Sequence, residues 1–177
     1  MKHIKDNSRQ FIPVNFCVIT MSDSRTIKTD KSGDSLISKI KEAGHILVER
    51  QIVPDDINKI SILLKKWIKQ KNVDVILGTG GTGLTGRDIT PEAFEQHYEK
   101  SIPGFGELFR MLSYNLIGTS TIQSRTTAGV SNGTYLFALP GSPGACRDAW
   151  EQILQYQLDN RTRPCNLVEL LPRLNEK

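Results

Sequence analysis

In the first half of the chain, short and nearly continuous apolar runs alternate with amphipathic stretches. The runs predict buried strands at 16–20, 46–53 and 73–79. Between them, apolar residues recur at helical spacing over 34–43 and 57–68, which predicts two helices that each bury one face. This β-α-β-α-β order, with strands that are apolar on both sides, is typical of a parallel sheet covered by helices.

The second half continues the alternation but adds one reversal of chain direction. An amphipathic stretch begins at Pro103, and another helical stripe follows the last apolar run. Asn132-Gly133 separates two strand-like runs at 126–130 and 134–139, and this dipeptide favours a tight hairpin. The pattern therefore predicts an α/β fold whose sheet is mostly parallel, with one antiparallel strand.

Length and charge narrow the class of protein. The chain has 177 residues, which suits a single domain, expected at 14–177, after a polar and flexible arm at 1–13. Its net charge of +4 suits an anionic small ligand, but it is not the concentrated basic face of a nucleic-acid binder. No apolar run approaches the roughly 18 residues needed to span a membrane, and the N-terminus does not resemble a signal peptide.

The spacing of the cysteines and histidines predicts neither disulfides nor a metal site. The three cysteines are widely spaced without a CxxC pair, so we expect free thiols and a reducing cytoplasm. The three histidines lack metal-ligand spacing, so we expect no structural metal.

Residues 75–91, VILGTGGTGLTGRDITP, carry the strongest chemical signal. A strand leads into the glycine loop Thr79-Gly80-Gly81-Thr82-Gly83, and Thr90-Pro91 opens the next helix. Backbone N–H groups and threonine hydroxyls in such a loop can surround a phosphate. Asp88 would repel that phosphate unless it holds a cation such as Mg²⁺, which bridges phosphate oxygens. The stretch predicts a site for a nucleotide or another phosphorylated ligand.

Two familiar phosphate-binding motifs do not fit this loop. Gly78-x-Gly80-x-x-Gly83 spells a dinucleotide fingerprint, but it follows the third predicted strand, and the helix opens seven residues after Gly83. A Walker A loop requires Gly-Lys-Ser/Thr, whereas this chain has Gly86-Arg87-Asp88. The remaining alternative is a glycine-rich turn that binds nothing.

Other polar residues follow neighbouring strands. Ser22 and Asp23 end one predicted strand and Asp55 ends another, and the carboxyl ends of parallel strands line the ligand crevice of such folds. Asp55 and Asp56 could instead cap the next helix. Gly141-Ser142 would offer a second anion site if its strand is parallel, and otherwise would only begin a helix.

Several motifs resemble one known family. The glycine loop, followed by Arg87-Asp88 and Thr90-Pro91-Glu92-Ala93, is similar to the signature of the MoaB/Mog family of molybdenum cofactor biosynthesis. Residues 20–25 resemble the family's first-strand loop. Further segments resemble its B branch: 103–113, 117–121, Ser124-Arg125, 139–142 and 161–166.

The resemblance implies a three-layer α/β/α domain that assembles as a homotrimer or homohexamer. It implies binding of molybdopterin, a pterin with a dithiolene and a terminal phosphate. In the Mog branch, molybdopterin and ATP react with Mg²⁺ to give adenylyl-molybdopterin and pyrophosphate. The adenylylated form then accepts molybdate, which makes a molybdate-insertion enzyme an implied partner. A non-catalytic molybdopterin-binding or carrier protein is the alternative.

The implied site residues divide by role. Asp55 and Asp88 match the family's two acidic positions and are expected to be catalytic and to hold Mg²⁺ with the ATP phosphates; some B-branch members lack these acids. A larger set is expected to bind substrate or nucleotide: Ser22, Asp23, Thr79, Gly80, Gly81, Thr82, Gly83, Gly141 and Ser142. Ser124 and Arg125 either contact an anionic group or serve the structure.

Overall fold

The computed structural model describes residues 4–176, so the ends of the predicted arm and domain, residues 1–3 and 177, lie outside the described residues. In that range, six strands form the central sheet in the order β3-β2-β4-β7-β6-β5. Their bounds are β2 (Asn15–Met21), β3 (Ile46–Val53), β4 (Val75–Thr79), β5 (Lys100–Ser101), β6 (Thr127–Ser131) and β7 (Thr134–Leu139). β2, β3, β4 and β7 are mutually parallel, and β6 runs antiparallel to its neighbours, which confirms the predicted mostly parallel sheet with one antiparallel strand.

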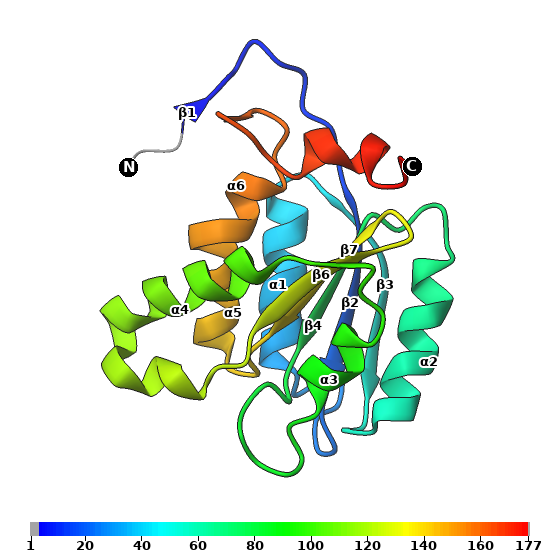
Figure 1. The fold of residues 1–177 in the computed structure, drawn as a ribbon, viewed down its shortest axis with the longest axis vertical. Helices are drawn as coiled ribbons and strands as arrows, with labels where there is room; N and C mark the ends of the chain where they lie inside the picture. The colour runs from blue at the N-terminus through cyan, green and yellow to red at the C-terminus, as the bar shows by residue number, and fades with distance from the viewer. Residues whose placement is uncertain (1–3, 177) are drawn as a thin grey trace.

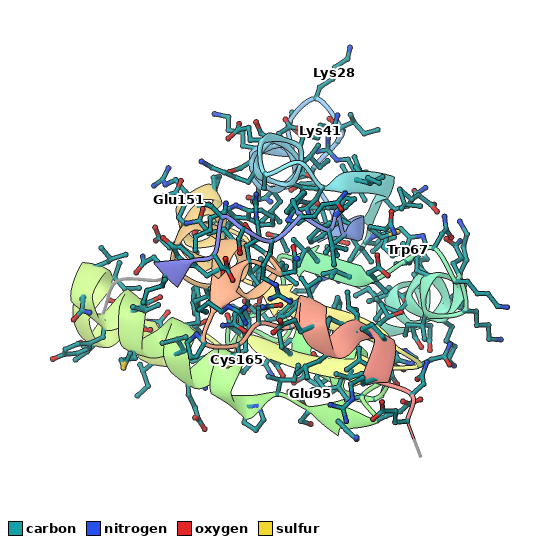
Figure 2. The ribbon with its side chains drawn as sticks, turned by 90° about the horizontal axis from the view of Figure 1, so that it is seen from above. Lys28, Lys41, Trp67, Glu95, Glu151 and Cys165 are labelled. Carbon is teal, nitrogen blue, oxygen red and sulfur yellow. The ribbon has the colours of Figure 1, made fainter. Side chains whose placement is uncertain are left out.

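Helices cover both faces of this sheet, giving the expected three-layer α/β/α fold. The α-helices are α1 (Lys31–Glu42), α2 (Ile57–Ile68), α3 (Thr90–Glu95), α4 (Pro103–Ile117), α5 (Pro143–Ala149) and α6 (Gln155–Gln157). The remaining helical turns are η1 (Gly118–Gln123), η2 (Trp150–Leu154) and η3 (Val168–Arg173). Figure 1 shows α1 and α5 against one face and α2 and α3 against the other. The view from above in Figure 2 separates the same two layers, with the labelled Trp67 on the α2 side.

Strand β2 shows why the apolar runs are continuous. Phe16 and Val18 are buried with α1, α5 and η2, whereas the alternating Cys17 and Ile19 are buried with α2 and α3. Successive side chains of a strand point to opposite faces, so a strand covered on both faces needs apolar residues at every position.

Local signals fix the ends of the elements. Asp30 caps α1 by accepting from the Gly33 N–H, and Asp56 caps α2 by accepting from two backbone N–H groups. Asn132 and Gly133 have φ of 47° and 80°, the values that a tight hairpin of this kind requires. The sequence interpretation of both the helices and the hairpin is therefore confirmed.

The N-terminal segment differs from the predicted flexible arm. β1 (Ile4–Lys5) pairs antiparallel with β8 (Thr162–Arg163), and the Ile12 N–H donates to Asn160 Oδ1 at 2.9 Å. Residues 4–13 are therefore held against the C-terminal segment, because their backbone donors find acceptors there. No helix among residues 4–176 is both long and apolar enough to cross a membrane.

Two consecutive helical elements project from the rest of the fold. α4 and η1, here called the α4–η1 arm (residues 103–123), extend away from the sheet before the chain returns into β6 (Figure 1). Large apolar side chains lie exposed on this arm: Leu108, Met111, Tyr114, Leu116, Ile117 and Ile122.

Candidate active site

The segments that follow the parallel strands meet at one edge of the sheet, at the bottom of Figure 1. The Ser22 N–H donates to Val53 O at 2.9 Å, which joins the segment after β2 to the end of β3. The Gly80 N–H donates to Leu139 O at 3.2 Å, which joins the glycine loop to the end of β7. The predicted convergence is therefore present, and β7 is parallel, as a second anion site at Gly141-Ser142 requires.

The glycine loop has a backbone that other residues would strain. Gly80 and Gly81 have φ of +106° and +60°. A Cβ on Gly80 would lie 2.3 Å from Met21 O, and one on Gly81 would lie 2.5 Å from Thr90 Oγ1. The glycines are thus required by close approach of β2 and α3, whatever the loop binds.

Thr79 contributes differently from what the sequence predicts. Its side chain is buried, and its hydroxyl donates to Pro140 O at 2.8 Å and lies 3.1 Å from Cys146 Sγ. A buried hydroxyl needs a partner inside the protein. The Thr79 hydroxyl therefore ties β4 to the turn after β7 and does not line the cavity, whereas Thr82 does.

Asp55 and Asp56 have separate roles. Asp56 caps α2, which leaves the Asp55 carboxylate free of capping. Asp55 Oδ1 is buried and has no hydrogen-bond partner among the described residues. Burial, followed by the negative charge of Asp88, raises the pKa of Asp55 above its ordinary value.

The pKa of Asp88 is shifted in the opposite direction to that of Asp55. Its Oδ2 accepts from the Thr85 N–H at 2.8 Å and from Thr85 Oγ1 at 2.6 Å. Burial alone would raise the pKa of Asp88, but the hydrogen bonds from Thr85 and Gly83 and the charge of Arg125 lower it below its ordinary value. Two carboxylates whose pKa values are shifted in opposite directions can take different roles at one site.

The two carboxylates flank the same short piece of backbone. Asp55 Oδ1 lies 3.1 Å from the position that a Cβ on Gly81 would take, and Asp88 Oδ2 lies 2.8 Å from the equivalent position at Gly83. No three His, Cys, Asp or Glu side chains gather into a metal-binding group in residues 4–176. Two carboxylates with substrate phosphates are nevertheless a usual ligand set for Mg²⁺, and a carboxylate with an unpartnered buried oxygen, as in Asp55, fits a group that gains partners when a ligand binds.

Arg125 holds the glycine loop in shape. Its backbone N–H donates to Thr82 O at 3.0 Å, and its guanidinium donates to Gly83 O at 2.7 Å and to Asp88 O at 2.5 Å. It also pairs with Glu92 at the start of α3. Of the two roles considered for this residue, these contacts favour the structural one. Ser124 lines the cavity, with its hydroxyl 2.8 Å from Thr126 Oγ1.

Two cavities lie among the segments that follow the parallel strands. The larger has a volume of about 510 Å³ and lies between residues 81–83, Asp88, the 140–142 turn and the α4–η1 arm. The arm contributes large apolar side chains to this cavity, together with smaller polar ones: Phe109, Leu116 and Ile117, and Ser113, Ser120, Thr121 and Gln123. A polar loop opposite large apolar side chains suits a ligand with a ring system and a phosphate.

Ser22 and Asp23 line a second cavity of about 410 Å³, together with Arg25 and Arg50. The Ser22 hydroxyl accepts from the Arg25 N–H at 3.2 Å, while Asp23 pairs with Arg87 and accepts from the Asp55 N–H at 3.3 Å. Asp23 therefore holds the backbone of Asp55, and neither Ser22 nor Asp23 lines the larger cavity.

Three residues at this edge of the sheet were not predicted from the sequence. Thr85 orients Asp88, Thr90 faces Gly81, and Arg25 donates to Gly141 O at 2.8 Å. Ser142 caps α5 by accepting from the Ala145 N–H at 3.1 Å, which fixes the same turn. A threonine three residues before an aspartate is a local signal that could have identified Thr85. The Arg25 contact joins residues far apart in sequence and left no such signal.

Comparison with known proteins identifies the family. The profile of the probable molybdopterin binding domain matches residues 17–160. Molybdenum cofactor biosynthesis protein B of Escherichia coli (strain K12) is 49% identical over 159 residues, which cover 90% of this chain and 94% of that protein. The protein of the same name from Bacillus subtilis (strain 168) is 43% identical over 147 residues, or 82% of this chain and 86% of that protein.

Solved structures agree with these relatives. A crystal structure of molybdenum cofactor biosynthesis protein B superimposes with a TM-score of 0.86 at 38% identity, covering 96% of this chain and all (100%) of that one. The tungsten cofactor synthesizing protein MoaB from Pyrococcus furiosus superimposes with a TM-score of 0.76 at 34% identity, covering 93% of this chain and 98% of that one.

Proposed function

We propose, for a chain that belongs to the molybdopterin-binding family of molybdenum cofactor biosynthesis proteins, that it adenylylates molybdopterin. In this reaction the terminal phosphate of molybdopterin attacks the α-phosphorus of ATP. A new P–O bond forms, the bond from the α-phosphorus to the bridging oxygen breaks, and pyrophosphate leaves. The products are adenylyl-molybdopterin and pyrophosphate.

The observation that carries this proposal is the placement of Asp55 and Asp88 beside residues 81–83. A protein that only binds or carries molybdopterin needs the phosphate loop but has no use for two carboxylates next to it. Carboxylates beside a phosphate site repel the ligand unless a cation lies between them. The pair therefore favours catalysis over the carrier alternative.

Asp88 and Asp55 would hold Mg²⁺ together with the ATP phosphates. When bound, Mg²⁺ neutralises charge that develops on the phosphate oxygens during transfer. Asp88 suits this task because Thr85 and Gly83 already stabilise its ionised form. The ionised form of Asp55 is less favourable, because burial disfavours its charge until a cation or a hydrogen-bond donor compensates.

The remaining residues position the reactants. Backbone N–H groups of the glycine loop would bind one phosphate, and the turn at Gly141-Ser142 would bind another. The apolar side of the larger cavity, built from Phe109 and Leu116, would hold the pterin ring. Phosphoryl-type transfer depends mainly on positioning and charge neutralisation, so no covalent intermediate with the protein is required.

The proposal includes self-association. The α4–η1 arm exposes Met111, Ile117 and Ile122 to 60%, 57% and 80% of their full accessible surface. Several large exposed apolar side chains on one arm are a candidate interaction site. A second copy of the chain is the proposed occupant, in a homotrimer or homohexamer, and it would bury these side chains.

The proposed setting is a reducing cytoplasm, supported by the three cysteines, all free in the described structure. The adenylylated product would pass to a molybdate-insertion enzyme.

The test is direct. The purified protein is incubated with molybdopterin, ATP and Mg²⁺, and the pterin is examined for transferred AMP. AMP on the pterin phosphate supports the proposal. Molybdopterin bound without any AMP transfer would instead establish the carrier alternative.

A further inference from the structure

Two buried side-chain oxygen atoms without hydrogen-bond partners lie close to Gly81 in the glycine loop. Thr90 Oγ1 and Asp55 Oδ1 are both buried, and neither has a hydrogen-bond partner among residues 4–176. A Cβ on Gly81 would lie 2.5 Å from Thr90 Oγ1 and 3.1 Å from Asp55 Oδ1. Both oxygens therefore adjoin the small space that the missing side chain of Gly81 leaves.

Thr90 is firmly placed at this position. It is the first residue of α3 and is completely buried at 0% exposure. Its backbone N–H donates to Gly81 O at 3.0 Å, which fixes α3 to the glycine loop. The backbone of Thr90 thus has a structural partner, whereas its hydroxyl has none. An unpaired buried hydroxyl is unfavourable and calls for an explanation.

The Thr90 hydroxyl and the Asp55 carboxylate are complementary in their hydrogen bonding. A hydroxyl can donate one hydrogen bond, and an ionised carboxylate can only accept. Asp55 must be ionised to hold a cation, and its buried oxygen then needs a donor. Thr90 is the hydroxyl that the described structure places beside that oxygen.

We propose that Thr90 is a positioning residue for Asp55: in the loaded site its hydroxyl donates a hydrogen bond to Asp55 Oδ1 across the space beside Gly81, which leaves the other carboxylate oxygen for the metal. This inference rests on the proposed function, because it takes Asp55 as a ligand of Mg²⁺. It adds a role for Thr90 and a reason for Gly81, since a Cβ there would enter the space between the two oxygens.

The test compares Thr90→Val, which keeps the shape but removes the hydroxyl, with Thr90→Ser, which keeps the hydroxyl. Mn²⁺ serves as the probe, and its binding in the presence of ATP is followed by electron paramagnetic resonance. Thr90→Val should weaken Mn²⁺ binding by about 10-fold or more, as expected for loss of a hydrogen bond to a charged group. Thr90→Ser should stay within about threefold of the unaltered protein, since it retains the donor.

A second measurement separates positioning from a structural role. In the ligand-free protein the Thr90 hydroxyl has no partner, so Thr90→Val should leave the thermal unfolding midpoint unchanged or raise it. A midpoint lowered by several degrees would mean that the hydroxyl already stabilises the fold, and this would overturn the inference.

The outcomes also separate this inference from the proposed function. If the unaltered protein binds Mn²⁺ with ATP but Thr90→Val binds it equally well, the role of Thr90 is wrong and the function stands. The same holds if Thr90→Ser is as weak as Thr90→Val. If the unaltered protein does not bind Mn²⁺ with ATP, the metal role of Asp55 fails, and the role of Thr90 fails with it.

Discussion

The two walls of the larger cavity are built in opposite ways. The wall formed by the glycine loop is polar and held by hydrogen bonds from several directions, including those of Thr85 to Asp88 and those of Arg125 to the loop carbonyls. The wall formed by the α4–η1 arm carries the large apolar side chains of the cavity, Phe109, Leu116 and Ile117, among smaller polar ones, and the arm extends away from the sheet (Figure 1). Its outer side leaves Met111 and Ile122 exposed.

The two walls suit different tasks. Groups that stabilise charge during a reaction must be in place beforehand, and the loop wall meets that requirement in the described structure. Apolar contact with a ring needs no fixed donors, and the exposed apolar side chains on the same arm offer a surface for a partner. The proposed function therefore places AMP transfer at the loop wall, and pterin contact and self-association at the arm.

Substitution of Asp88, on the loop wall, should reduce activity most. Asp88→Asn should lower the rate of AMP transfer by about 100-fold or more, because it removes the charge that holds Mg²⁺. Binding of molybdopterin, measured by fluorescence titration, should change little. Asp56→Asn is the matched control, since asparagine caps a helix as well as aspartate, and its turnover should remain near that of the unaltered protein. Undiminished turnover of Asp88→Asn would remove Asp88 from the mechanism.

A stability comparison between the walls comes next. Gly80→Ala should lower the free energy of unfolding by about 2 kcal/mol or more, because its Cβ would meet Met21 O at 2.3 Å in a positive-φ conformation. Gly104→Ala, on the arm, has no atom within 4 Å of its Cβ. It should be neutral or stabilising by about 0.5 kcal/mol, since alanine favours helix. Urea unfolding of both variants checks the contrast, and equal losses would contradict it.

Self-association should respond to the arm alone. The double variant Met111→Glu and Ile122→Glu should shift the protein towards monomer in analytical ultracentrifugation, because charge on a buried interface is costly. The free energy of unfolding of the monomer should change by no more than about 0.5 kcal/mol, as expected for exposed positions. Ile62→Glu, on the exposed side of α2 with 69% exposure, is the control and should leave association unchanged. An unchanged oligomer in the double variant would place the interface elsewhere.

Asp55 and Asp88 should have small and opposite effects on the stability of the protein, and each effect should depend on pH. The pKa of Asp55 is raised, so the folded protein binds more protons than the unfolded chain at this residue, and stability falls as pH rises from its ordinary pKa through the raised one. The pKa of Asp88 is lowered, so its contribution is present above the ordinary value and is lost as pH falls towards the lowered one. In the metal-free protein at neutral pH, Asp55→Asn should therefore raise the unfolding midpoint and Asp88→Asn should lower it. Calorimetry should show shifts of roughly 1–4 °C, given the usual scaling for a domain of this size. Shifts in the same direction would contradict the assignment.

The contrast between the walls also explains what the sequence could predict. The glycine loop and Asp88 lie within a few residues of one another, so their chemistry is legible as a local pattern. The sheet edge that gathers Asp55 followed from the order of strands and helices alone. Both predictions depend on short-range patterning, which sequence carries directly.

Contacts between distant segments were harder to predict. The choice between Asp55 and Asp56 as the helix cap depends on backbone geometry at a single residue, and the sequence left it open. The clamp formed by Arg125 depends on where β6 begins relative to the glycine loop. The anchoring of residues 4–13 depends on Asn160, far along the chain. The apolar stripe of α4 suits a core and an interface equally, because periodicity does not reveal what lies opposite.

AMP transfer to molybdopterin can be observed directly by ³¹P NMR. A spectrum is recorded after the protein has reacted with limiting molybdopterin, excess ATP and Mg²⁺. We predict that the terminal phosphomonoester signal of molybdopterin is replaced by the two signals of a phosphoanhydride, with one pyrophosphate released for each molybdopterin consumed. An unchanged phosphomonoester signal with bound molybdopterin, or pyrophosphate release without the new signals, would contradict it.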